Sequence, residues 1–109
     1  MKKMNNTTLD LILLTSKVLN DIDVETRHIN KKLMRLQSKA KNEAPENERK
    51  IFLNGCKVAK QGVKKIQREV LKLRFKKPEV DTVGQLQLIK DEIIKQRIVI
   101  DQIYQEIMG

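Results

Sequence analysis

Apolar residues recur at alternating spacings of three and four along three long stretches of this chain, at residues 12–40, 52–73 and 86–107. This spacing places an apolar side chain on the same side of an α-helix in every turn, as in helices that pack side by side. The pattern therefore predicts three long amphipathic helices.

Two short polar segments, each containing one of the two prolines, separate these stretches. Pro45 is tolerated in the first turn of a helix, whereas Pro78 pushes the residues before it out of helical geometry. Thr7, three residues before Asp10, is a candidate cap for the first helix. The predicted helices span about residues 8–41, 46–76 and 81–107, and residues 1–6 are expected to be disordered.

The linkers between these helices are short enough to allow only antiparallel neighbours. The predicted fold class is therefore all-α, an antiparallel up-down-up bundle of three helices that forms a single domain over residues 1–109. At about 1.5 Å per residue, the helices are roughly 40 to 50 Å long, which is typical of bundles. A two-helix hairpin that dimerises is the alternative architecture.

The composition favours a chain that folds in water. Hydrophobic residues make up 39 % and charged residues 34 % of the sequence, a balance too apolar for a disordered tail. The longest apolar run, residues 11–14, is far shorter than the roughly 18 residues of a transmembrane helix. The first residues lack the apolar core and cleavage site of a signal peptide. We therefore expect a cytoplasmic protein.

The sequence contains no pattern of a catalytic, cofactor-binding or metal-binding site. Cys56 is the only cysteine and His28 the only histidine, too few for an internal disulfide or for the roughly four ligands of a structural zinc site. Cys56 falls within an apolar series and is expected in the core, while His28 is expected on the outer surface. The chain is predicted not to be an enzyme and to use no cofactor, metal ion or small-molecule substrate.

Positive charge is concentrated in the middle of the chain. The formal net charge is +9, and residues 27–77 contain 17 of the 23 lysines and arginines but only 4 of the 14 acidic residues. On a helical wheel, the cations of the second helix fall within an arc of roughly 140° opposite its apolar series, over about 33 Å. They are Lys50, Lys57, Lys60, Lys64, Lys65, Arg68 and Lys72, to which the first helix adds Lys31 and Arg35.

Such a basic face is either a solvated surface or a contact surface for an anionic partner. Like charges four residues apart in a helix repel by a few tenths of a kcal/mol each, and only Glu69 lies among them. A protein partner is favoured over nucleic acid, because three aromatic residues offer few stacking surfaces. Non-specific contact with nucleic-acid phosphates is the alternative, and lipid headgroups share the same charge.

The third helix carries more apolar residues than one series uses. Leu88, Ile94, Ile98 and Val99 lie off the series, and a helix in a monomeric bundle buries only about a third to a half of its circumference. Ile94 and Ile98 are predicted to contact a partner, either a second copy of the chain or another protein. A broad interface within one chain is equally compatible with these residues.

Small residues mark one side of the second helix at Gly55, Ala59 and Gly62. Each glycine costs about 1 kcal/mol relative to alanine in a helix interior. The favoured explanation is that a bulky residue of another helix fills this notch. The alternative is a groove that accepts a side chain of a partner.

In size, basicity and helicity the chain is similar to the small intracellular immunity proteins of bacteriocin producers, which are helical bundles. In outline it also resembles three-helix cochaperone and adaptor modules. The resemblance implies an interaction protein that acts as an adaptor, an inhibitor or an immunity-type protein. It assigns no site residues, because a shared fold does not carry function.

Overall fold

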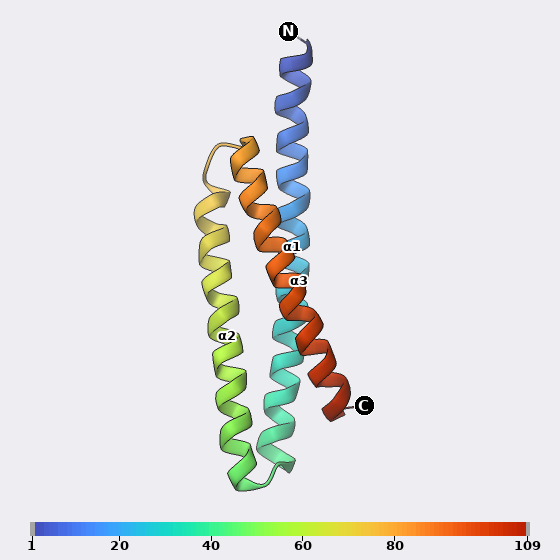
Figure 1. Ribbon diagram of the computed structural model, residues 1–109, viewed down its shortest axis with the longest axis vertical. Helices are drawn as coiled ribbons and strands as arrows, with labels where there is room; N and C mark the ends of the chain where they lie inside the picture. The colour runs from blue at the N-terminus through green and yellow to red at the C-terminus, as the bar shows by residue number, and fades with distance from the viewer. Residues whose placement is uncertain (1, 109) are drawn as a thin grey trace.

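The computed structural model consists of three α-helices joined by two short turns (Figure 1). It describes the backbone of residues 2–108 and the side chains of residues 8–108. The helices are α1 (Lys2–Glu43), α2 (Glu46–Arg74) and α3 (Val80–Met108). They contain 93 % of the described residues, and no strand occurs among those residues. The predicted all-α fold class is confirmed.

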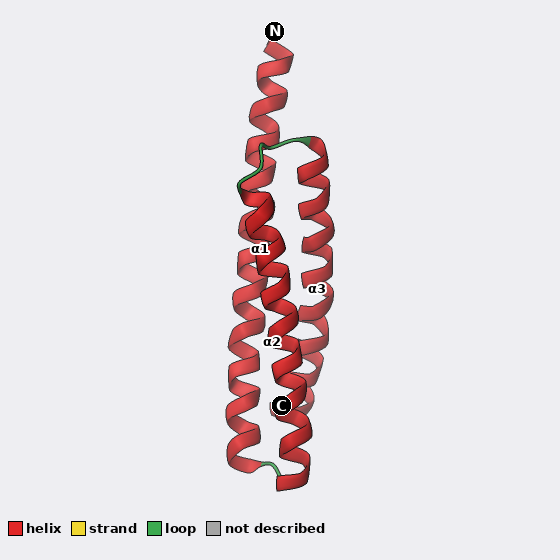
Figure 2. Ribbon diagram, turned by 90° about the vertical axis from the view of Figure 1, so that its left-hand side faces the viewer, coloured by secondary structure: helices red, strands yellow, loops and turns green. Residues whose placement is uncertain are grey.

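Successive helices run antiparallel to one another, as predicted. The chain descends along α1, returns along α2 and descends again along α3, which crosses α1 obliquely (Figure 1). Seen from the side, α2 lies in front of the other two helices (Figure 2). Helix α1 packs against both neighbours and most extensively against α3, whereas α2 and α3 contact each other least. Helix α1 is therefore the centre of the bundle.

The apolar series supply most of the core. Cys56 is buried, as expected. In α1, Val18 is fully buried, while its neighbour Leu19, which belongs to the predicted series, packs against the core from a half-buried position. The large side chains that are less than 2 % exposed are Ile22, Ile29, Leu33, Leu36, Val63, Leu86 and Ile93.

Two predicted helix ends differ from the structure. Helix α1 begins at Lys2 and passes through Thr7, so Thr7 does not cap it, and Met1 of the segment expected to be disordered lies outside the described residues. Helix α2 ends at Arg74 rather than near residue 76, because the backbone N–H of Lys76 donates to the carbonyl of Leu73 at 3.1 Å and closes a tighter turn before Pro78.

The N-terminal end of α1 extends past the other two helices. Helix α1 has 42 residues, whereas α2 and α3 have 29 each, and its N-terminal end projects beyond the α2–α3 turn (Figure 1). Ile12, which the sequence placed at the start of the apolar series, is 44 % exposed there. The apolar series of α1 therefore begins in the sequence before the point at which α2 and α3 start to cover this helix.

A cluster of charged side chains fixes α3 against α1. The carboxylate of Asp101 accepts hydrogen bonds from Lys32 Nζ at 2.6 Å and from His28 Nε2 at 2.8 Å. Arg97 donates to the other oxygen of this carboxylate at 3.0 Å and also pairs with Glu25 of α1. His28 therefore lies half-buried between the two helices and not on the outer surface, because α3 packs on its side of α1.

Further pairs assign the two flanks of α1 to different neighbours. On one flank, Asp21 pairs with Lys90 of α3 at 2.9 Å. On the other flank, Asp23 pairs with Arg74 of α2 at 3.2 Å. These pairs match the placement of α3 on one side of α1 and of α2 on the other.

The environment of Asp101 shifts its acidity. Desolvation raises the pKa of this carboxyl, but the hydrogen bonds from Lys32, His28 and Arg97 together favour the charged form more strongly and lower the pKa to about 2. The charged form of Asp101 is therefore bound more tightly in the folded chain than in the unfolded chain, where the pKa is near its usual value.

Replacing Asp101 by asparagine should lower the free energy of unfolding at pH 7 by about 1 to 2 kcal/mol. Because the folded-state pKa is depressed, the contribution of the charge is fully present above about pH 4 and is lost as the pH falls from about 4 to 2. Urea denaturation followed by circular dichroism should show a difference between wild type and variant that shrinks at acidic pH. Asp91→Asn, at an exposed position of α3, is the matched control. An equal loss of unfolding free energy at neutral and at acidic pH would contradict this role for the Asp101 charge.

Candidate interaction surfaces

The basic face of α2 is the first candidate surface. We use this name for the seven cations predicted above, of which six are exposed and one, Lys60, is half-buried and donates to Gln37 Oε1 of α1 at 2.8 Å. Within the described part of the chain, the six exposed cations form no ion pair and no side-chain hydrogen bond. They are Lys50, Lys57, Lys64, Lys65, Arg68 and Lys72.

The two predicted cations of α1 lie apart from this face. Arg35 donates to the hydroxyl of Tyr104 on α3 at 3.5 Å, which places it on the α3 side of α1. Lys31 is exposed and, on a helical wheel, lies almost opposite the buried stripe of α1. The structure therefore brings the cations of α2 together but does not join Lys31 and Arg35 to them.

The surplus apolar residues of α3 fall on two different flanks. Ile94 is half-buried and Ile98 is 45 % exposed, both on the flank toward the charged cluster with α1. Leu88 and Val99 are 70 % and 53 % exposed on the opposite flank, toward α2. The bundle therefore leaves these four side chains partly or largely exposed.

An apolar groove of about 390 Å³ runs between α2 and α3. It forms where these two helices make little contact, so that a residue of α1, Ile29, lies at its base. The residues that α2 and α3 contribute to the groove are Val58, Ala59, Gly62 and Val63, and Glu92, Lys95, Gln96, Val99 and Ile100.

The glycines of α2 are not used for close packing within the chain. Gly55 is exposed and Gly62 is half-buried at the groove. A methyl group added at either position would have no neighbouring atom within 4 Å beyond the adjoining backbone of its own helix. The favoured explanation, a notch filled by a bulky residue of another helix, is therefore wrong.

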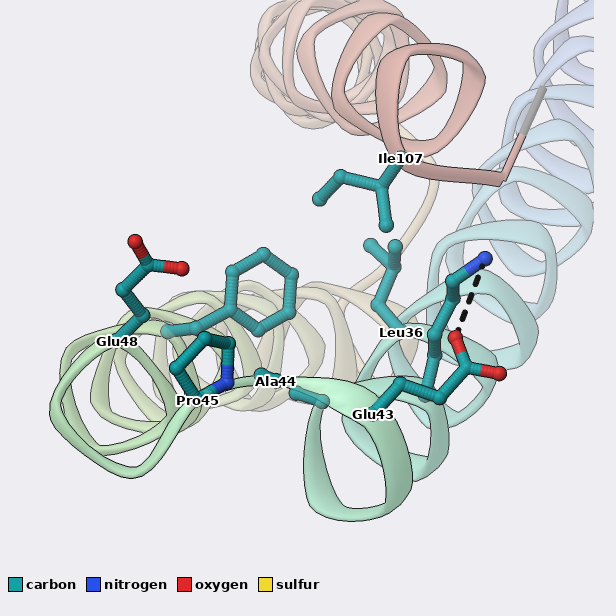
Figure 3. A pocket seen from close by; sticks show the side chains of 9 residues that line it. Leu36, Glu43, Ala44, Pro45, Glu48 and Ile107 are labelled. Atoms are coloured by element: carbon teal, nitrogen blue, oxygen red, sulfur yellow. Dashed lines mark ion pairs between the residues drawn. The ribbon is translucent and has the colours of Figure 1, made fainter.

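A second apolar pocket, of about 330 Å³, lies at the end of the bundle where α1 turns into α2. Leu36 and Ile107 meet at its inner side, and Pro45 and Ala44 of the turn border it (Figure 3). The ion pair between Lys39 and Glu43 lies at its rim. The pocket lies at the level where α3 ends, short of the α1–α2 turn (Figure 1).

The projecting end of α1 is a surface that sequence reasoning did not identify. Leu9, Ile12, Leu13 and Leu14 are between 39 % and 60 % exposed. In the sequence, this surface could have been recognised because apolar residues occur on every side of the helix in this segment. A helix that buries only one stripe needs apolar residues on one side alone.

The described residues contain no group of three or more side chains placed to hold a metal ion. Burial raises the pKa of the Cys56 thiol, against a smaller opposing effect of the charge on Lys60. Cys56 is thus a protonated core residue at neutral pH. Also within the described residues, no helix is both long and apolar enough to cross a membrane.

Comparison with known proteins gives no relative: no family model, no curated protein and no solved structure matches this chain.

Replacing Gly62 by alanine should raise the free energy of unfolding by about 0.5 to 1 kcal/mol, since the added methyl group meets no other side chain and alanine favours the helix. Thermal unfolding would measure the change. Gly84→Ala in α3, where the added methyl group is equally unopposed, serves as the matched control. Destabilisation by Gly62→Ala alone would show that the notch is filled after all.

Whether Ile94 and Ile98 join two chains remains a prediction. Burying partly exposed isoleucines across a two-fold axis is favourable, and an Ile94→Glu, Ile98→Glu double variant should dissociate a dimer formed in this way. Analytical ultracentrifugation of both proteins tests the prediction. A wild type that is monomeric at every accessible concentration would rule out the homodimer, and a dimer that survives the double substitution would rule out this surface.

Proposed function

We propose that this chain is a non-catalytic interaction protein of the cytoplasm, an adaptor, inhibitor or immunity-type protein that docks an acidic protein through the basic face of α2. The observation that carries this proposal is the set of six exposed cations on one side of α2 that have no partner in the described chain.

The contrast with the rest of the molecule supports this proposal. Where α1 meets its neighbours, cations and carboxylates are paired across the helix interfaces. On α2 the cations instead repel one another, and only Glu69 interrupts them. The repulsion among these cations lowers the stability of α2 in the free chain, and contact with an anionic partner surface would relieve it. The attraction between opposite charges would also speed association with that partner.

Two observations favour protein over nucleic acid as the partner. The long straight helices lack the compact helix-turn-helix arrangement that reads the major groove. Large apolar residues are also exposed beside the basic face, among them Val58 at 60 % and Leu71 at 53 %, and apolar contact is typical of protein interfaces rather than of phosphate binding. Non-specific phosphate contact is the competing outcome of the test below.

Reversing the charge at Lys57, Lys64 and Arg68 to glutamate should leave the helix content unchanged and abolish binding of the acidic partner. The matched control reverses three exposed cations elsewhere, Arg27, Lys76 and Lys77, and changes the net charge equally. The measurement is quantitative mass spectrometry of proteins captured from the native cell by wild type, variant and control.

An acidic protein captured by wild type and control but lost with the variant supports the proposal. Equal capture by all three proteins would show that the face is only solvated. Tight binding of duplex DNA by the wild type, with an affinity that falls steeply with salt, would favour the nucleic-acid alternative instead.

A further inference from the structure

The groove between α2 and α3 is the part of the bundle that its three helices leave open. Its base is apolar, with Ile29, Val63 and Ile100 buried beneath it. Val58 on the α2 wall and Val99 on the α3 wall are 60 % and 53 % exposed. Each wall thus presents an apolar side chain to the groove without the other wall covering it.

The exposed apolar surface continues along both walls. On a helical wheel, Ile51 lies on the same flank of α2 as Val58, and Leu88 on the same flank of α3 as Val99. Because α2 and α3 are antiparallel, Ile51 extends the surface toward one end of the bundle and Leu88 toward the other. At about 1.5 Å per residue the surface is roughly 27 Å long, which is the length of a helix of about 18 residues.

The walls of the groove leave room for the backbone of a further helix. Gly62 lines the groove, and Gly55 lies on the same flank of α2 on a helical wheel. At both glycines the space that a side chain would occupy is open. Small residues allow helices to approach closely, whereas bulky residues would hold an incoming helix away. A fourth helix seated here would complete a four-helix bundle with α1 at the base.

The charge beside the groove selects the occupant. Lys65 and Lys72 follow directly after the α2 wall on the helical wheel and are exposed without partners in the described chain. The α3 wall is mixed, with Glu92 and Lys95. A second copy docked groove to groove would bring two basic faces together, which repulsion opposes. An occupant with acidic residues on its α2 side is attracted.

We propose that the groove between α2 and α3 binds one amphipathic helix of the acidic partner, with its apolar face on Val58 and Val99 and its acidic flank along Lys65 and Lys72. This inference rests on the function proposed above and names the form in which the partner is recognised, a helix lying in a groove.

The test uses a synthetic probe and the full chain. The probe is a fluorescent helical peptide of about 18 residues with leucines on one face and glutamates on the flanks. A peptide of the same composition with the periodicity scrambled is its control. Fluorescence anisotropy should show saturable binding of the probe and none of the scrambled peptide, and the affinity should fall with salt.

Two variants locate the site. Val99→Glu places a carboxylate on the wall of the groove and should weaken binding by about tenfold or more. Val24→Glu is the matched control, because Val24 is also a valine that is 53 % exposed but lies on the outer side of α1. In NMR spectra of the labelled protein, the amide signals of Gly55 and Gly62 should shift on binding, while that of Val24, on the outer side of α1, stays in place.

The outcomes separate this inference from the function on which it rests. Loss of binding with Val99→Glu and not with Val24→Glu supports the groove. Binding that survives Val99→Glu but is lost on reversing Lys57, Lys64 and Arg68 overturns the groove and leaves the basic face in place. Failure of the amphipathic probe to bind, or equal binding of the scrambled peptide, overturns the groove as the seat of an acidic helix.

Discussion

The structure depends on one constraint, which is that a single apolar stripe on α1 serves two neighbouring helices at once. Ile22, Ile29, Leu33 and Leu36 are buried beneath both α2 and α3. Since α2 and α3 both pack on α1, they bury most of their apolar side chains against it and make little contact with each other. The groove between α2 and α3 follows from this arrangement.

Electrostatics divides the surface of the bundle in two. Around α1 and α3, carboxylates such as Asp21, Glu25 and Asp101 are paired with cations across the helix interface, which fixes the height of α3 along α1. An isolated exposed pair contributes about 0 to 1 kcal/mol, whereas several charges that form a network, as around Asp101, contribute more. On α2 the exposed cations are left without such partners in the described chain, so that the net charge of the protein is displayed mainly on one helix.

The fold was predictable because it follows from the spacing of residues close together in the sequence. The periods of three and four, the two prolines and the short linkers specified three antiparallel helices, and most residues of the predicted series are buried or half-buried. Helix ends were less predictable, because Thr7 and residues 75 and 76 are compatible with either a helix or its cap, and neighbouring structure decides between them.

The candidate surfaces were predictable only in part. A helical wheel identifies the cations of α2 because they belong to one helix, but it cannot show that Arg35 turns toward Tyr104, which lies 69 positions away in the sequence. The same limit explains why His28 was placed on the outside and why Gly62 was expected to be filled. Each of these assignments depends on where α3 crosses α1, and the spacing of residues within one helix does not contain that angle.

The features of α2 on which the proposed partner contact depends also lower the stability of this helix. Gly55 and Gly62 lower its helix propensity, its aligned cations repel, and its contact with α1 is smaller than that of α3. Helix α2 is therefore expected to open more readily than α3, because local stability follows local contact. A helix that binds in the groove and neutralises the cations would offset all three effects at once, so that partner binding and the folding of α2 are thermodynamically linked. Under this proposal, substitutions that stabilise α2 by filling the groove or by pairing its cations should weaken partner binding, since they alter the surface proposed to bind the partner.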